Sequence, residues 1–122
     1  MANFEDVAKE FVGFYYNTFD SDRSQLTALY RDTSMLTFES SATQGAAAIG
    51  EKLANLSFTN VKHVVTTLDA QPSVNNGIVV LVTGQLQTEG EERPMNYTQV
   101  FQLLPEGETY YVHNDVFKLI YG

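Results

Sequence analysis

The second half of this sequence consists almost entirely of strand-forming segments, and this limits the folds open to the chain more than any other feature. Aromatic and β-branched residues fill four runs, at residues 61–68, 78–86, 97–104 and 110–119. Turn-forming or charged stretches separate the four runs, at residues 72–77, 89–94 and 105–107. Because consecutive strands joined by short turns pair antiparallel, we expect an antiparallel sheet.

The first half predicts three helices and one short strand. Apolar residues recur at helical spacing over residues 4–19, with Asn3 as the N-cap. Asp22 and Gln25 resemble a capping box that opens a short helix ending near Leu29, and a third helix is expected over residues 46–56. The strand is expected over residues 35–39. Helices followed by adjacent strands indicate an α+β fold.

The expected architecture is a cone. A long, strongly curved antiparallel sheet wraps around the N-terminal helix and leaves a pocket at its mouth, within a single domain over residues 1–122. Residues 78–82 are apolar on both faces, and we expect Val112 and Val116 on one face of the last strand, with Phe117 and Leu119 on the other. The three helices cover only one face. Since monomers rarely expose a wide apolar face, we expect a sheet-to-sheet homodimer.

Composition excludes several classes of function. A net charge of −8 argues against nucleic acid as a partner and favours basic protein surfaces. The absence of Cys excludes thiol chemistry, and two His do not make a metal site, so we expect no metal and no cofactor. Residues 1–6 lack the features of a signal peptide, and no apolar run approaches the ~20 residues of a membrane helix. We therefore expect a soluble intracellular protein with no membrane partner.

Asp115 lies in an otherwise apolar strand, where burial would raise the pKa of its carboxyl group. Cone-shaped folds also host isomerases and dehydratases, in which an Asp base works with Tyr or His donors. This alternative uses Asp115 as the base, with Tyr30, Tyr97 or His113 as the donor. No nucleophile motif, phosphate loop or metal-ligand spacing accompanies it. The competing prediction is that Asp115 is a structural hydrogen-bond partner.

Six stretches, spread over the whole chain, keep the order and spacing of one known family. They are FYYNTFDSDRSQL at 14–26, LTFE at 36–39, QG at 44–45, EKL at 51–53, TLDAQP at 67–72 and YVHNDVF at 111–117. The sequence resembles the nuclear transport factor 2 family, and most of all its fungal members, which carry Phe rather than Trp beside the key glutamate.

The resemblance implies a homodimeric carrier with no catalytic activity. It implies that one surface binds the GDP form of the GTPase Ran and another binds Phe-Gly repeat nucleoporins. The carrier would then be found in the cytoplasm, the nucleus and the nuclear pore complex. Phe4 falls on the aromatic used for nucleoporin binding, and Leu81 and Val116 fall on positions of the dimer interface.

The resemblance also implies a Ran site in which an apolar pocket receives an aromatic side chain and carboxylates pair with the basic residues beside it. The pocket aromatic is Phe38, and the acid beside it is Glu39. The remaining implied positions are the walls Leu56, Phe58 and Phe117, the rim residue His63, and the acidic loop residues Glu89 and Glu91. The loop departs from many relatives, which have Asp at its first acidic position and lack Gly90, and it is slightly longer. Glu89, Glu91 and Glu92 are therefore all candidates for the contact with Ran.

From the residues alone, each of these positions also has a structural alternative. Phe38 is then a core residue and Glu39 a solvated one, and a lone His63 is a satisfied structural residue. The acids at 89–92 then blunt a sheet edge, and Phe4 is a hydrophobic staple. Because Glu39 follows Phe38 on what we expect to be a short edge strand, their side chains are predicted to point to opposite faces.

Overall fold

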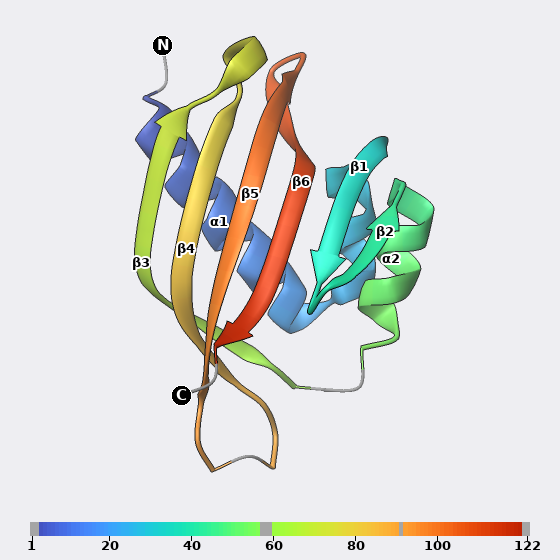
Figure 1. Cartoon of the computed structure of the whole chain (residues 1–122), viewed down its shortest axis with the longest axis vertical. Helices are drawn as coiled ribbons and strands as arrows, with labels where there is room; N and C mark the ends of the chain where they lie inside the picture. The colour runs from blue at the N-terminus through green and yellow to red at the C-terminus, as the bar shows by residue number, and fades with distance from the viewer. Residues whose placement is uncertain (1–2, 57–59, 91, 121–122) are drawn as a thin grey trace.

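A computed structural model describes residues 3–56, 60–90 and 92–120. Its elements, in chain order, are α1 (Phe4–Ser21), the 3₁₀ helix η1 (Arg23–Leu29), β1 (Tyr30–Phe38), β2 (Ser41–Gln44), α2 (Ala46–Ala54), β3 (Lys62–Pro72), the 3₁₀ turn η2 (Val74–Asn76), β4 (Ile78–Gln87), β5 (Met95–Glu106) and β6 (Thr109–Ile120). The six strands form one sheet in the order β2-β1-β6-β5-β4-β3. In Figure 1, α1 crosses behind strands β3 to β6, while α2 lies beside β1 and β2. The predicted α+β class with three main helices is therefore confirmed.

Helix α1 forms where the capping and apolar patterns placed it. The side chain of Asn3 accepts a hydrogen bond from the Glu5 amide at 2.7 Å, which satisfies one of the free N–H groups of the first turn. The helix ends at Ser21, where the amide of Asp22 donates to the carbonyl of Thr18. One face of the helix packs on the sheet, through Ala8, Val12, Tyr15, Tyr16, Thr18 and Phe19. No helix in the described ranges is long and apolar enough to cross a membrane.

The start of the sheet differs from the prediction. Strand β1 begins at Tyr30 rather than residue 35, and β2 follows it as an additional edge strand. β1 pairs parallel with β6 and antiparallel with β2, so it is an interior strand and the sheet is mixed. The first half of β1 was not predicted, because the polar residues at 31–34 break the apolar–polar alternation that is typical of a half-buried strand.

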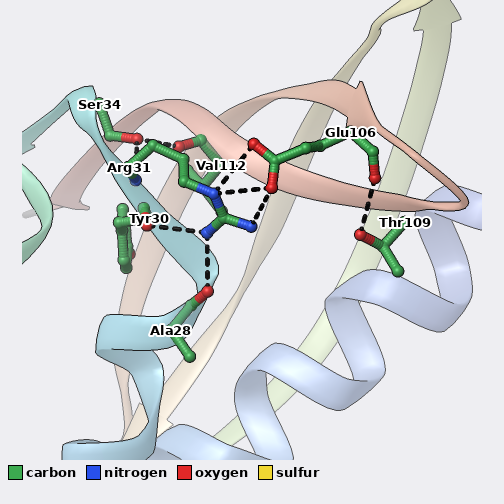
Figure 2. A network of polar contacts seen from close by, with 7 residues as sticks. All are labelled: Ala28, Tyr30, Arg31, Ser34, Glu106, Thr109 and Val112. Carbon is green, nitrogen blue, oxygen red and sulfur yellow. Dashed lines mark hydrogen bonds and ion pairs between the residues drawn. The ribbon is translucent and has the colours of Figure 1, made fainter.

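Arg31 fixes the start of β1 against the hairpin that joins β5 and β6 (Figure 2). Its guanidinium forms a two-pronged ion pair with Glu106, with nitrogen–oxygen distances of 2.7 to 3.1 Å. The same group donates to the backbone carbonyls of Ala28 and Tyr30, each at 2.9 Å. Arg31 thus ties the last residues of η1, the start of β1 and the end of β5 together, where the parallel pairing begins.

The last strand contains an irregularity that corrects one prediction. The register between β5 and β6 slips by one residue near His113, so β6 carries an extra residue there. Val112 is fully buried, whereas Val116 is 45% exposed. These two side chains therefore lie on opposite faces, and the prediction that they share a face is wrong. After the slip, Asp115 and Phe117 occupy the buried face.

An apolar row crosses the sheet face that the helices leave uncovered. Leu81 on β4 pairs with Val100 on β5, which pairs with Val116 on β6. The side chains at both ends of the row, Leu81 and Val116, are each 45% exposed. Large apolar side chains in a continuous row on an open sheet face are typical of a surface that another protein covers.

Candidate functional site

A small cavity lies near the ends of β1 and β6 and the start of β3. Side chains from the helix layer and from five strands line it: Tyr15, Phe19, Leu36, Phe38, Leu53, His63, Leu86, Gln99, Asp115 and Phe117. The space open to the centre of a water molecule is about 10 Å³, which suits about one water. Three of the predicted Ran-site residues, Phe38, His63 and Phe117, meet here.

Stacked aromatic rings form one wall of the cavity. The rings of Phe38 and Phe117 are nearly parallel, with centroids 4.6 Å apart and an angle of 4° between their planes. Phe117 in turn stacks on Tyr97 at 5.5 Å. Phe117 is only 3% exposed, whereas Phe38 is only partly buried and packs at the margin of the core. Phe38 is therefore the ring of this stack that lies nearest to solvent.

The floor of the cavity is a buried polar network around Asp115. One carboxylate oxygen, Oδ2, accepts hydrogen bonds from Tyr30 at 2.7 Å and Tyr15 at 3.1 Å. The other, Oδ1, accepts from Nε2 of Gln99 at 2.7 Å, and Oε1 of Gln99 accepts from Tyr16 at 2.8 Å. These contacts confirm the prediction that Asp115 is a structural hydrogen-bond partner. Because three donors surround it, the carboxylate is satisfied although it is only 1% exposed.

Burial dominates the titration of this network. It raises the pKa of Asp115 to about 6, and the hydrogen bonds from Gln99, Tyr30 and Tyr15 oppose that shift. Burial, together with the charge of Asp115, raises the pKa of both tyrosine hydroxyls well above their usual value. Tyr15 and Tyr30 therefore stay protonated and remain donors at physiological pH.

The shifted pKa of Asp115 gives a stability prediction. The folded state holds its proton up to about pH 6 and the unfolded state only up to about pH 4, so this group stabilises the fold as pH falls between these values. Relative to Asp115→Asn, the wild type should gain about 2 kcal/mol of unfolding free energy between pH 7 and pH 4. Urea denaturation of both proteins at one protein concentration measures this difference, because the other carboxyl groups titrate alike in both. Parallel pH profiles would contradict the prediction.

His63 is held by α1 rather than free at the rim. Its Nδ1 lies 2.6 Å from the carboxylate of Asp20, and its backbone amide donates to the same carboxylate at 2.9 Å. The imidazole stacks on Tyr16 at 4.2 Å, and the side chain is only 2% exposed. His63 therefore joins the end of α1 to the start of β3 and forms part of the cavity wall.

Glu39 does not lie on a strand, so the prediction that Phe38 and Glu39 alternate along an edge strand is wrong. Glu39 and Ser40 form a two-residue turn between β1 and β2, with φ of 51° and 72°. The chain reverses directly after Phe38, because β1 pairs with β2 there. The sequence pattern did not indicate this pairing. Glu39 is nevertheless adjacent to the cavity, since its amide donates to the carbonyl of Phe117 at 3.1 Å.

The other predicted site residues are more scattered. Leu56 lines a separate, open surface depression beside α2, together with Lys52, and does not reach the cavity. Glu89 lies on the β4–β5 loop and accepts a hydrogen bond from Asn60. Phe58 and Glu91 lie outside the described residues. Phe4 is at the far end of α1, about 22 Å from Phe19 by the helical rise.

Sequence reasoning missed the residues that surround Phe38 and Phe117 inside the cavity. Tyr15 and Gln99 are the most informative of these, because both bond to Asp115. Gln99 was detectable, since it is the one polar residue at an inward position of its strand and is 3% exposed. Of the donors proposed for an enzyme, Tyr30 alone hydrogen-bonds Asp115 among the described residues, while Tyr97 and His113 do not.

Comparisons with known proteins assign the chain to a family. The nuclear transport factor 2 domain matches residues 7–119. The chain belongs to the nuclear transport factor 2 family. It is 60% identical over 124 residues to nuclear transport factor 2 of Emericella nidulans, a match that spans 100% of this chain and 99% of the relative. The protein of the same name from Saccharomyces cerevisiae is 53% identical over 121 residues, with 98% and 97% covered.

A solved structure supports the family at the level of coordinates. Nuclear transport factor 2 of Cryptosporidium parvum superposes with a TM-score of 0.92 and 41% sequence identity, covering 96% of this chain and 94% of that one. The match includes the strands that carry the cavity, since it spans nearly the whole chain. The nuclear transport factor 2 fold is thus shared along almost the full length of the chain.

Proposed function

We propose that this member of the nuclear transport factor 2 family is a homodimer that carries Ran-GDP into the nucleus and passes the pore by binding Phe-Gly repeat nucleoporins. The observation behind the proposal is the near-full-length identity of 53–60% to fungal proteins named nuclear transport factor 2. At that identity the chain is a transport factor and not an enzyme. We further propose that residues 1–122 act as one domain that moves between cytoplasm, nucleus and nuclear pore.

The Ran site in this proposal is the cavity mouth and the acidic groups around it. Phe38 covers the cavity, and Glu39 follows it directly in the β1–β2 turn. An aromatic side chain of the partner enters when Phe38 swings from its stack on Phe117, a side-chain movement of the kind common at interfaces. Glu39 and Glu89 then form ion pairs with basic residues beside that aromatic. The proposed Ran site further includes Leu56 and His63, and also Phe58 and Glu91, which lie outside the described residues.

Capture of purified Ran tests the proposal directly. The immobilised chain should retain Ran loaded with GDP and leave Ran loaded with GTP in solution. This selectivity is expected if the pocket binds a conformation of Ran that only the GDP form adopts. Equal capture of both forms, or of neither, would overturn the proposed cargo. Bovine serum albumin and an unrelated small GTPase loaded with GDP serve as controls for non-specific binding to an acidic surface.

The isomerase or dehydratase alternative finds less support. The Asp115 carboxylate lies within hydrogen-bond distance of donors on Tyr15, Tyr30 and Gln99, which leaves few of its lone pairs for a substrate. With Phe38 stacked on Phe117, the adjoining cavity has room for about one water. Pockets that bind small molecules are typically larger by more than a factor of ten.

The nucleoporin site is proposed around Phe4, at the end of α1 remote from the cavity (Figure 1). Phe4 is partly buried and packs against the core, so part of its ring remains open to a partner. Two separated surfaces let the carrier hold cargo and pore together, and dimerisation doubles each weak contact.

Phe4→Ala should therefore weaken binding to a Phe-Gly repeat peptide by about three- to tenfold, since truncation removes part of the burial energy of one aromatic ring. Binding of Ran-GDP should change by less than about twofold, within the usual limit for independent sites. Calorimetry with both partners measures the two effects. Equal losses for both partners, or a collapse of the thermal unfolding transition, would assign Phe4 to the core instead.

A further inference from the structure

The turn that carries Glu39 is a strained element. It joins β1 to β2 through two residues only, and both have positive φ, 51° at Glu39 and 72° at Ser40. Two-residue hairpin turns of this kind favour Asn and Gly, because other side chains are disfavoured at positive φ. Neither residue here is Asn or Gly, so contacts outside the turn must stabilise it.

The end of β6 supplies two of these contacts to Glu39 itself. The Glu39 amide donates to the carbonyl of Phe117 at 3.1 Å. The backbone amide of Leu119 donates to Oε1 of Glu39. Within the described residues no donor reaches the other carboxylate oxygen, Oε2. One oxygen therefore fixes the direction of the carboxylate while the second remains available to a partner.

Two lysines hold the turn from outside it. Nζ of Lys118 on β6 donates to the hydroxyl of Ser40 at 2.7 Å. Nζ of Lys52 on α2 donates to the hydroxyl of Ser41 at 3.0 Å. The chain has only seven Lys and Arg residues against fifteen acidic ones, yet one of its cations contacts this turn and a second contacts the first residue of β2 directly after it. The neighbouring serines each receive one ammonium group, so the turn is tied to both β6 and α2.

We propose that Lys118, acting through the Ser40 hydroxyl and supported by Lys52 at Ser41, is a positioning residue that presents Oε2 of Glu39 to a cationic side chain of the partner. This inference rests on the proposed function, because the partner side chain is one that flanks the aromatic of Ran-GDP. The lysines do not touch that side chain. They hold the turn in its bound conformation before the partner arrives. Binding therefore does not incur the entropy cost of ordering the turn.

A purely electrostatic role for Lys118 predicts the opposite effect. An ammonium group beside Glu39 repels a cationic partner, so its removal alone would strengthen binding. A positioning role predicts that removal weakens binding, and that loss of the Ser40 hydroxyl weakens it equally although the charge of Lys118 stays. The Ser40 variants therefore separate the two roles.

The experiment is calorimetric titration of Ran-GDP into the wild type, Ser40→Gly, Ser40→Asn and Lys118→Met. Glycine removes the hydroxyl and accepts positive φ, so it relieves strain rather than adding it. Asparagine also accepts positive φ and restores an acceptor for Lys118. Ser40→Gly and Lys118→Met should each weaken binding by about three- to tenfold, the range for one lost hydrogen bond, and Ser40→Asn should recover most of the loss.

A second pair of variants separates positioning from general stability. In a Glu39→Gln background, Ser40→Gly should cause no further loss of affinity, since the charge that the turn presents is already gone. Sedimentation and thermal unfolding should match the wild type for every Ser40 variant. Unchanged affinity of Ser40→Gly, tighter binding by Lys118→Met, or an additive loss in the Glu39→Gln background would each overturn the positioning role. A wild type that fails to bind Ran-GDP would instead overturn the proposed function.

Discussion

Val116→Glu should convert the proposed homodimer to a monomer at micromolar concentration. Val116 is 45% exposed in the single chain and stands in register with Val100 and Leu81, in the middle of the face opposite the helices. A second copy that covers this row places the new carboxylate in a dry interface. A two-fold interface repeats each change, so two unpaired charges become buried at once.

The expected loss is large because each buried, unpaired charge costs several kcal/mol. Sedimentation equilibrium at a series of concentrations measures the change in mass. Phe14→Glu is the matched control, since Phe14 is 56% exposed but lies on α1, in the layer opposite the apolar row. That variant should remain a dimer. A Val116→Glu protein with the mass of a dimer at micromolar concentration would show that another surface mediates the assembly.

Glu39→Lys should abolish the proposed binding of Ran-GDP while the protein stays folded. The substitution reverses the charge that the β1–β2 turn presents beside the cavity mouth, and loss of one such contact typically costs about 2–5 kcal/mol, or a factor of about 30 to several thousand. The fold should persist, because Glu39 is only partly buried and the turn keeps its backbone contact to Phe117.

Two variants control this experiment. Glu39→Gln keeps an oxygen for the Leu119 amide and removes only the charge, so it should show an intermediate loss. Glu108→Lys makes the same change of net charge at an exposed position in the hairpin between β5 and β6, remote from the cavity. It should alter Ran-GDP affinity by less than about twofold at physiological salt. Wild-type affinity in Glu39→Lys would exclude the assigned rim, and an equal loss in Glu108→Lys would indicate a non-specific effect of net charge.

The order of the elements was predictable because it rests on local patterns. Asn3 and Asp22 mark helix starts through their side-chain acceptors, and both accept those bonds in the structure. The four long strands follow from their β-branched and aromatic runs. The class of fold then follows from the order of helices and strands along the chain.

The departures arise where pairing over long distances overrides local pattern. The extra residue near His113 reverses the face of every residue after it, and nothing local to the strand signals such a slip. The position of β1 beside β6 likewise depends on contacts made far along the chain. Ser34 is fully buried within β1, although the polar residues around it in the sequence are typical of a loop.

The candidate site was predictable to the extent that it follows the family pattern at single positions. Phe38, His63 and Phe117 do line one cavity. The polar floor was only half visible, since Asp115 stood out in an apolar strand whereas its partner Tyr15 looked like one more core aromatic on α1. A hydrogen bond between residues 100 positions apart has no local signature.

The parallel pairing of β1 with β6 also governs when the protein can assemble during synthesis. Tyr30 and Asp115, which bond across this pairing, lie 85 positions apart, and Ser40 and Lys118 lie 78 apart. While the chain is being synthesised, β1 and the turn after it emerge from the ribosome long before the β6 residues that bond to them. The cavity and its rim therefore form only after β6 has emerged from the ribosome. Such long-range pairing favours slow folding, and it leaves apolar strand surface exposed until β6 pairs.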